Sequence, residues 1–175
     1  MTENTKWNVV FLIDKNPPSK VILLKRSAQK DYAPNFYTGI GGKIGDIPGL
    51  ENETPLDSAY RELAEETQGE LNEQNIKLHE FARCVYENDL VLYYFWGLYT
   101  KEKLPRFDIQ DGTLAWVNTK NILNHDIIPT TKAVCTEWAK RNFNVDQPFT
   151  VCVKEIGKNN TIRLIEVLKT ESGLI

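Results

Sequence analysis

The sequence predicts one domain of the α/β (α+β) class, with a mixed β-sheet packed against helices. Runs of strand length, rich in apolar and β-branched residues, alternate with segments whose apolar residues recur at helical spacing. A chain of 175 residues is long enough to bury one full hydrophobic core. The pattern shows no repeat, low-complexity segment or linker, so we expect no internal domain boundary.

The first part of the chain is predicted to open with a strand hairpin. Apolar runs at Trp7–Asp14 and Lys20–Arg26 flank the turn-forming segment Lys15–Ser19, which contains two prolines. After a polar loop, Asn35–Ile40 is expected to form a further strand. This strand leads directly into the glycine pair Gly41–Gly42.

A helix is predicted over about Pro55–Gln68. Thr54 or Glu53 precedes it as a candidate cap, and proline is favoured at the first helical position. An apolar stripe at helical spacing would dock the helix on the sheet. The stripe consists of Leu56, Ala59 and Leu63.

The second half of the chain is predicted to hold more strands and a second helix. The strands Ile76–Glu87 and Leu90–Thr100 flank a turn, and Val91–Trp96 is so apolar that we expect burial on both faces. The remaining expected elements are a strand at Leu114–Val117, helices at Thr119–Leu123 and Pro129–Asn142, and a terminal hairpin of Phe149–Ile156 and Thr161–Leu168.

Composition argues against several kinds of protein. The net charge of −3 gives no broad basic surface, so long nucleic acid is not an expected partner. The apolar run Val9–Ile13 is too short to span a membrane, and the N-terminus lacks a signal-peptide pattern. The cysteines Cys84, Cys135 and Cys152 are odd in number and lack metal-type spacing. They indicate reduced thiols and therefore a cytoplasmic location.

The most informative stretch is Gly41–Gly69, with the sequence GGKIGDIPGLENETPLDSAYRELAEETQG. Glu62, Glu65 and Glu66 fall on one face of the predicted helix, at spacings i, i+3 and i+4. Like charges so placed cost a helix about 0.2–0.5 kcal/mol per pair, so this face is either solvated surface or the seat of a cation. Oxygen ligands favour a hard divalent ion such as Mg²⁺. Upstream, the glycines allow close approach of a ligand, and Lys43 can meet a phosphate.

The same stretch resembles the Nudix box of the Nudix hydrolases. The residues that match its spacing are Glu53, Arg61, Glu62, Leu63, Glu65 and Glu66. Two departures are visible: ten residues separate Gly42 from Glu53 where the signature has five, and Gln68 occupies the slot of the closing glycine. The first departure lengthens a loop at residues 44–52, for which a lid and a neutral insertion both remain open. Neither departure removes a carboxylate.

This resemblance implies the Nudix fold, a mixed curved β-sheet sandwiched between helices. It implies a single domain over residues 1–175, with the family core at about residues 7–142 and an extra C-terminal β-hairpin at about residues 148–170. It also implies Mg²⁺, with Mn²⁺ as an alternative, held by the Gly41 carbonyl and the carboxylates of Glu62, Glu65 and Glu66. Such an ion neutralises the oxygens of a diphosphate and activates water for in-line attack.

The remaining site residues take their expected roles from the resemblance. Arg61 is expected to pair with Glu53 or a neighbouring carboxylate and to hold the helix against the loop. The general base stays open between Glu62, Glu65 and Asp111, and Asp111 also fits an ordinary turn aspartate. The expected substrate contacts, each also compatible with a solvated or packing role, are Lys25, Arg26 and Lys43 at the phosphates and Tyr37 and Thr38 at the base or other leaving portion.

The chain looks most like the MutT-type branch, which implies cleavage of a nucleoside triphosphate, modified nucleotides included, to the nucleoside monophosphate and pyrophosphate. Overall length, the Lys25-Arg26 strand end and the run Leu114–Pro129 carry this likeness. Two alternatives stay open. One is hydrolysis of another nucleoside diphosphate compound such as a dinucleoside polyphosphate, to which the offset of Tyr86 points, and the other is a nucleotide sensor without catalysis. Family members often associate in pairs, so a homodimer is also expected.

Overall fold

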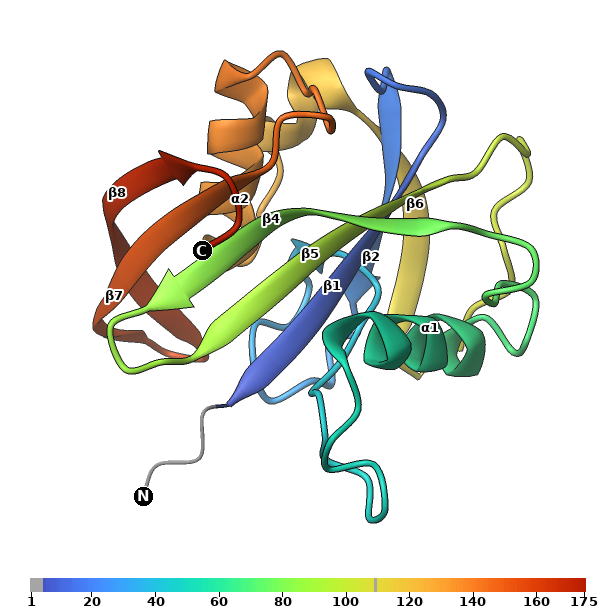
Figure 1. The fold of residues 1–175 in the computed structure, drawn as a ribbon, viewed down its shortest axis with the longest axis horizontal. Helices are drawn as coiled ribbons and strands as arrows, with labels where there is room; N and C mark the ends of the chain where they lie inside the picture. The colour runs from blue at the N-terminus through green and yellow to red at the C-terminus, as the bar shows by residue number, and fades with distance from the viewer. Residues whose placement is uncertain (1–4, 109) are drawn as a thin grey trace.

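The computed structural model describes residues 5–108 and 110–175 (Figure 1). It contains an eight-stranded mixed sheet, two α-helices and a 3₁₀ helix in those residues, which confirms the predicted fold class. In chain order the elements are β1 (Lys6–Ile13), β2 (Lys20–Arg26), β3 (Tyr37–Thr38), α1 (Pro55–Glu66), β4 (Leu78–Tyr86), β5 (Val91–Leu98), β6 (Gly112–Asn118), η1 (Thr119–Asn124), α2 (Pro129–Lys140), β7 (Phe149–Asn159) and β8 (Ile162–Ser172).

The central strand β1 determines the layout of the sheet. The strand order is β3-β2-β1-β5-β4-β7-β8, and β6 pairs with β2 outside this path. β1 pairs in parallel with β5 along its whole length, but it pairs with β2 only through its last two residues. The segment Ile40–Lys43 fills the gap that this leaves, through bridges to Val10 and Trp7. The glycine pair is therefore inserted into the sheet beside β1.

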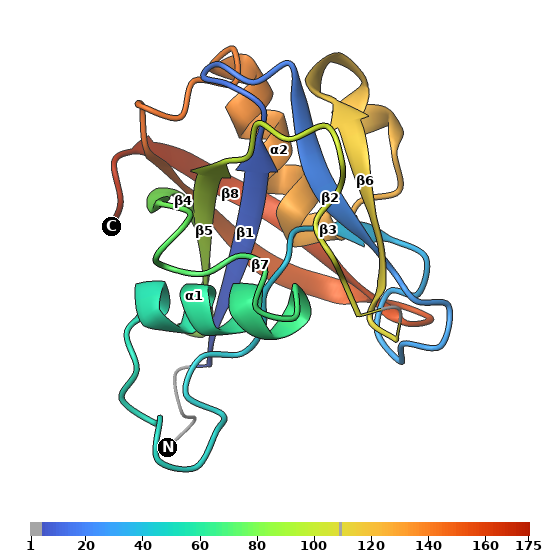
Figure 2. The ribbon, with the colours of Figure 1, turned by 90° about the vertical axis from the view of Figure 1, so that its right-hand side faces the viewer.

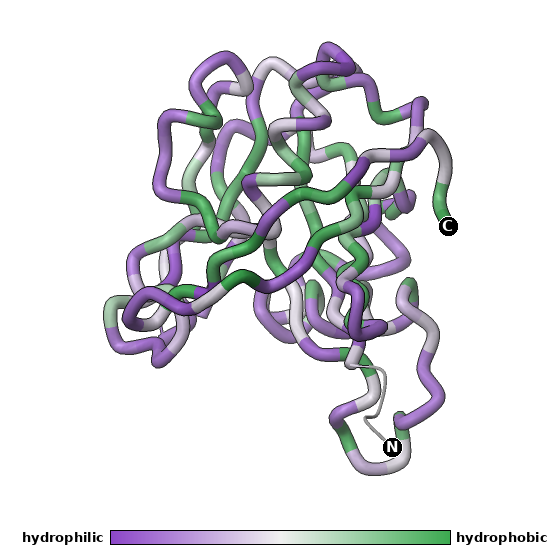
Figure 3. The backbone as a smooth tube through the Cα atoms, turned by 90° about the vertical axis from the view of Figure 1, so that its left-hand side faces the viewer, coloured by the Kyte–Doolittle hydropathy of each residue, from purple (hydrophilic) through white to green (hydrophobic). Residues whose placement is uncertain are grey.

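Two apolar clusters lie on opposite faces of β1, because successive side chains of a strand point to opposite sides. One cluster contains Phe11 of β1 and packs under α2, where the Phe11 and Trp138 rings stack with centroids 5.8 Å apart. The other contains Val10 and Leu12 and packs under Ala59 and Leu63 of α1. Figure 2 shows α1 crossing the sheet near the start of β1, and Figure 3 shows mainly hydrophilic residues in the outlying loops, with more hydrophobic residues toward the middle of the fold.

The cap and proline signals in the sequence predicted the bounds of α1 closely. The helix covers Pro55–Glu66, and its cap is Thr54, whose hydroxyl oxygen accepts a hydrogen bond from the Asp57 amide at 3.1 Å. Of the two caps considered, Thr54 rather than Glu53 therefore caps the helix, because the Glu53 carboxylate is held by Arg61. At the other end of the helix, Gln68 adopts a positive φ of 54°.

The strand expected over Asn35–Ile40 is wrong in extent, since only Tyr37–Thr38 forms β3. The chain changes partner within the predicted strand: Tyr37 and Thr38 pair with β2, whereas Ile40 bridges β1. Gly39 lies at this crossing, where a Cβ would come within 2.6 Å of the Val10 carbonyl oxygen. The close approach of two backbone segments ends the strand.

The expected burial of Val91–Trp96 on both faces holds only at the centre of the run, where Tyr94 belongs to one apolar cluster and Phe95 to the other. Only Tyr94 and Phe95 are buried in that run, and the other side chains are half-buried. Each helix has 12 residues and so spans about 18 Å, at ~1.5 Å per residue. The eight residues of β5 extend over about 26 Å at ~3.3 Å per residue, so the helices cannot cover the whole strand.

The predicted C-terminal hairpin is present and longer than expected. β7 and β8 have 11 residues each and pair with each other antiparallel, while β7 adds in parallel to β4. The hairpin thus continues the main sheet instead of forming a separate layer (Figure 1). The helix predicted at Thr119–Leu123 is the 3₁₀ helix η1. No helix in the described residues has the length and apolar character needed to cross a bilayer.

Candidate active site

Gly41 and Gly42 occupy positions where the structure leaves no room for a side chain. Gly41 has a φ of 150°, and a Cβ there would lie 2.3 Å from the Asn8 carbonyl oxygen. A Cβ on Gly42 would lie 2.5 Å from the carboxyl group of Glu62. The two glycines are therefore required for different reasons, one by the β1 backbone and the other by a carboxylate of α1.

Asn8 joins β1, the glycine segment and α1. Its Nδ2 donates to Ser58 Oγ at 2.9 Å and to the Gly42 carbonyl at 3.3 Å, and its backbone amide donates to the same carbonyl at 2.9 Å. The side chain is buried, and its Oδ1 has no hydrogen-bond partner in the described part of the chain. No motif in the sequence identifies Asn8 as a site residue. The available signal was a lone asparagine inside an apolar strand.

Arg61 connects the charged residues of α1. Its Nε and Nη2 donate to both carboxylate oxygens of Glu53, at 3.1 and 2.7 Å, as the sequence analysis expected for this pair. Its Nη1 donates to Glu62 Oε1 at 2.8 Å and to Glu65 Oε2 at 3.4 Å. The hydrogen bonds from Arg61 hold the pKa of Glu53 at about 2, and the Glu53 carboxylate in turn raises the pKa of Arg61.

Glu66 Oε2 is buried and has no hydrogen-bond partner among the described residues. Burial is the main cause that raises the pKa of Glu66, to about 8, and the negative charges of Glu62 and Asp111 act in the same direction. A hydrogen bond from the Gly41 backbone lowers the pKa of Glu66 in part. Burial also raises the pKa of Glu62, against the effect of Arg61. An unpartnered buried carboxylate is unfavourable, and a cation would relieve that cost.

The three carboxylates do not form a preassembled metal cage. Within residues 5–108 and 110–175, no three side chains of His, Cys, Asp or Glu converge closely enough to hold a metal ion. Arg61 Nη1 already contacts two of the carboxylates, and the side chain of Glu65 is 56% exposed.

The donor atoms nevertheless fit a hard divalent cation, because all of them are oxygens. Glu66 contributes the orphaned Oε2. The carbonyls of Ile40 and Gly42 accept hydrogen bonds from β1, whereas none to the Gly41 carbonyl is present in the described residues. The Gly41 carbonyl thus stays available as a ligand.

Arg26 and Asp111 lie on the β2–β6 side of Glu66. The Arg26 Nε donates to the Tyr32 carbonyl at 3.0 Å, and burial lowers the pKa of Arg26 although the charges of Asp111 and Glu66 raise it. The Asp111 carboxylate forms an ion pair with Lys30. Lys30 was not among the predicted site residues, because a lysine in a polar loop gives no local signal. The structure therefore brings Arg26, Lys30, Asp111 and Glu66 into one charged region.

The predicted base-contacting residues lie along β3. Lys25 is exposed, with Nζ 6.0 Å from the ring centroid of Tyr37, and that ring meets His125 edge-on at 5.1 Å. The Thr38 hydroxyl lies 3.3 Å from that of Thr131. Lys43 is exposed on the glycine segment. The structure thus places Lys25 next to Tyr37, whereas Lys43 comes from the segment beside β1.

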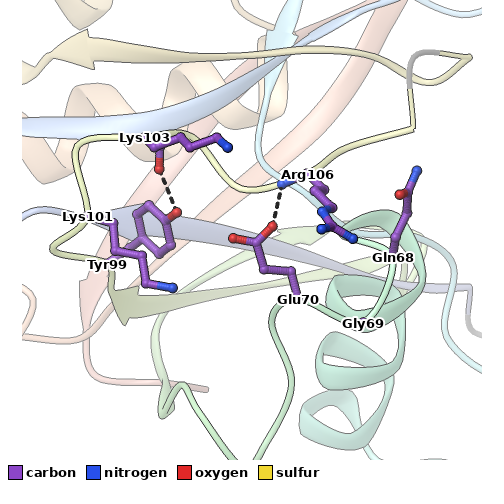
Figure 4. Close-up of a pocket in the computed structure, with 7 residues that line it drawn as sticks. All are labelled: Gln68, Gly69, Glu70, Tyr99, Lys101, Lys103 and Arg106. Carbon is purple, nitrogen blue, oxygen red and sulfur yellow. Dashed lines mark hydrogen bonds between the residues drawn. The ribbon is translucent and has the colours of Figure 1, made fainter.

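A cavity of about 480 Å³ lies at the C-terminal end of α1 (Figure 4). It is lined by Gln68, Gly69, Glu70, Tyr99, Lys101, Lys103 and Arg106. Figure 4 shows Glu70 accepting from the Arg106 amide, at 2.8 Å, and Tyr99 donating to the Lys103 carbonyl, at 2.7 Å. Its lining includes none of the site residues that the sequence predicted, so this cavity is not the predicted site.

A family model described as the NUDIX domain matches residues 5–138. No curated protein sequence matches the chain significantly. Many solved structures share its fold. The mutator MutT protein from Bacillus halodurans aligns over 96% of this chain and 97% of its own, with a TM-score of 0.58 and 15% identity.

Two further structures show the range of proteins with this fold. The C. elegans Ap4A hydrolase aligns over 79% of this chain and 97% of its own, with a TM-score of 0.53 and 14% identity. The bifunctional NMN adenylyltransferase/ADP ribose pyrophosphatase from Francisella tularensis aligns over 80% of this chain and 42% of its own, with a TM-score of 0.52 and 15% identity. At such identities the likeness establishes the fold alone.

Proposed function

The chain belongs to the NUDIX domain family and is a hydrolase of pyrophosphate bonds, and from this premise we propose that it cleaves a nucleoside triphosphate to the monophosphate and pyrophosphate with a divalent cation. The observation that supports the cation is Glu66 Oε2, buried and unpartnered beside the Gly41 backbone. We propose Mg²⁺ as the ion, with Mn²⁺ as the alternative.

Glu62, Glu65, Glu66 and the Gly41 carbonyl are the proposed ligands. When bound, the ion supplies charge neutralisation on the diphosphate and lowers the pKa of water. Arg61 holds Glu53 through Nε and Nη2 and reaches the two ligand carboxylates only through Nη1. Ion binding would therefore displace Nη1 alone, and the Glu53 pair would keep α1 attached to the loop.

We propose roles in proton transfer and phosphate binding for the remaining charged side chains of the predicted site. Glu62, Glu65 and Asp111 remain the proposed general bases. To accept a proton, Asp111 would have to leave its ion pair with Lys30. Arg26, Lys25 and Lys43 are proposed to bind the phosphate chain, because bidentate and point-charge cations both suit phosphate oxygens.

The nucleotide portion is proposed to lie along β3, at Tyr37 and Thr38. The structural neighbours carry names that refer to different substrates, so the choice of a triphosphate rests on chain length, the Lys25-Arg26 strand end and the run Leu114–Pro129. Modified nucleotides are the proposed subset, because a half-buried aromatic ring at Tyr37 can select among bases by stacking.

The test is a substrate panel for the purified protein with Mg²⁺, containing ordinary and modified nucleoside triphosphates, dinucleoside polyphosphates and ADP-ribose. Glu66→Gln should abolish most of the rate while the fold persists, and the exposed Glu73→Gln serves as the matched control. A preference for dinucleoside polyphosphates would replace the proposed substrate class. Nucleotide binding without cleavage of any compound would instead favour a sensor.

A cytoplasmic location and a homodimer are further proposals. Cys84 and Cys135 are buried, Cys152 is half-buried, and all three are free thiols, which supports a reducing compartment. Size-exclusion chromatography with light scattering would test the homodimer, and a monomer mass of 20.1 kDa would contradict it.

A further inference from the structure

The tip of the C-terminal hairpin lies against the loop of residues 27–36 that follows β2 (Figures 1 and 2). The Ala33 amide donates to the Thr161 carbonyl at 3.2 Å. The Tyr32 hydroxyl faces Arg163 of β8, whose backbone and charge lower the pKa of Tyr32 against the larger effect of burial, while the Arg163 guanidinium pairs with Glu155 at 3.8 Å. The hairpin therefore contacts the loop through its backbone.

The same loop contacts Arg26 through both its side chain and its backbone. The Arg26 Nε donates to the Tyr32 carbonyl at 3.0 Å, and its guanidinium lies 5.9 Å from the centroid of the Tyr32 ring. The Arg26 amide donates to the Phe36 carbonyl at 2.9 Å, and its carbonyl accepts from the Asn35 amide at 3.2 Å. Tyr32 thus contacts the hairpin with its hydroxyl and Arg26 with its carbonyl and ring.

The loop needs outside contacts to keep this conformation. Ala33 adopts a positive φ of 46°, in a region that alanine disfavours, and Asn35 adopts a φ of 65°, which asparagine tolerates better than most other residues do. Lys30 of the same loop forms the ion pair with Asp111. If the loop relaxed, Arg26 and Lys30 would both lose the positions they hold beside Glu66 and Asp111.

We propose that the C-terminal hairpin is a positioning element of the substrate site, and that its tip holds the 27–36 loop so that Arg26 and Lys30 face the anionic phosphate chain. The proposal rests on the proposed function, since it assigns these two cations to a polyphosphate. The NUDIX family model ends at residue 138, before β7 and β8 begin. An element outside the matched residues thereby contributes to the site of this chain.

Two variants test the contact from its two sides. Tyr32→Phe keeps the ring beside Arg26 and removes the hydroxyl that meets the hairpin. Asn160→Val acts from the turn of the hairpin, where Asn160 has a φ of 50° that a β-branched residue disfavours. Tyr60→Phe is the matched control, because the hydroxyl of Tyr60 in α1 accepts a hydrogen bond from the Leu78 backbone amide at 3.0 Å, outside residues 27–36.

Both variants should accelerate amide hydrogen exchange in residues 27–36, and Tyr60→Phe should not. Binding of inorganic tripolyphosphate with Mg²⁺, followed by calorimetry, should weaken about three- to tenfold, the range expected for one hydrogen bond. With a hydrolysed nucleotide, KM should rise by the same factor and kcat should change little.

Unchanged loop exchange, or faster exchange with unchanged tripolyphosphate binding, would overturn the proposal. Failure of the proposed function has a different signature: wild-type protein would bind tripolyphosphate, both variants would bind it more weakly, and the wild type would still hydrolyse no nucleotide.

Discussion

Arg61 donates to both carboxylate oxygens of Glu53, with Nε–Oε2 at 3.1 Å and Nη2–Oε1 at 2.7 Å. The two side chains are only 15% and 6% exposed. Glu53 Oε1 also accepts from the Gly45 amide at 3.0 Å. The pair therefore attaches α1 to both ends of the loop of residues 44–52, and this explains how an enlarged loop leaves the helix in place.

Arg61→Lys should destabilise the protein by about 1–3 kcal/mol, because an ammonium cannot reproduce the two-pronged contact in a largely buried position. Denaturant unfolding monitored by fluorescence measures the loss. Arg83→Lys is the control, since Arg83 pairs with Glu80 of its own strand and is 26% exposed. That variant should lose less than about 1 kcal/mol. Equal losses in the two variants would contradict a special role for the Glu53 pair.

Gly42→Ala should displace Glu62 while leaving the fold largely intact. The added Cβ would lie 2.5 Å from the Glu62 carboxyl group, which is the movable end of a side chain. We expect a loss of hydrolysis of at least about tenfold, because a small misplacement of a reacting group is costly. Steady-state kinetics and circular dichroism measure the two effects. Gly49→Ala is the control, since no atom lies within 4 Å of a Cβ there, although its φ of 90° will cost some stability. Full activity in Gly42→Ala would show that the position of Glu62 is unimportant.

The sequence predicted α1 and its charged face well because the signals are local. Thr54, Pro55 and the Glu53–Arg61 spacing all act within one loop and helix. Contacts between distant segments gave no such signal. Asn8 meets Ser58 across 50 positions, and Lys30 meets Asp111 across 81. No local pattern encodes either pair, and each depends on how β1 and β2 pack.

The predicted metal ligands show the same limit. Helical spacing places Glu62, Glu65 and Glu66 on one face, but it does not show that Arg61 contacts the first two or that Glu66 Oε2 is buried. The Gly41 backbone that acts on Glu66 belongs to the segment that bridges β1, which helical spacing does not show either. Their function as ligands stays a prediction.

Gln68→Gly should stabilise the protein by about 0.5–1 kcal/mol. Gln68 has a φ of 54° immediately after α1, and a left-handed residue other than glycine carries a conformational cost of about 1 kcal/mol. The side chain is exposed, so little packing is lost. Thermal unfolding should show a Tm increase of about 1–4 °C. The control is Gln74→Gly, at an exposed position without a positive φ, and this change should destabilise the protein. A loss of stability in Gln68→Gly would contradict the explanation.

Glu66→Gln should stabilise the protein at alkaline pH when divalent ions are chelated. Burial raises the pKa of Glu66 from the ordinary 4.5 to about 8 in the folded state. The folded state therefore binds the proton more tightly than the unfolded state, and stability that is complete below pH 4.5 declines as pH rises to 8. Replacing the carboxylate by an amide removes this decline, so at pH 9 the variant should exceed the wild type by about 1–3 kcal/mol.

Added Mg²⁺ supplies the second half of this prediction. A cation at Glu66 Oε2 favours the ionised carboxylate, so millimolar Mg²⁺ should raise the alkaline stability of the wild type, with a concentration dependence set by its affinity. The Glu66→Gln variant lacks the charge, so Mg²⁺ should stabilise it at pH 9 no more than Mg²⁺ stabilises the exposed control Glu73→Gln at acid pH. At acid pH, Glu66 of the control is protonated and does not attract the ion. If Mg²⁺ stabilises wild type and Glu66→Gln equally at pH 9, then the ion binds elsewhere and Glu66 is not its ligand.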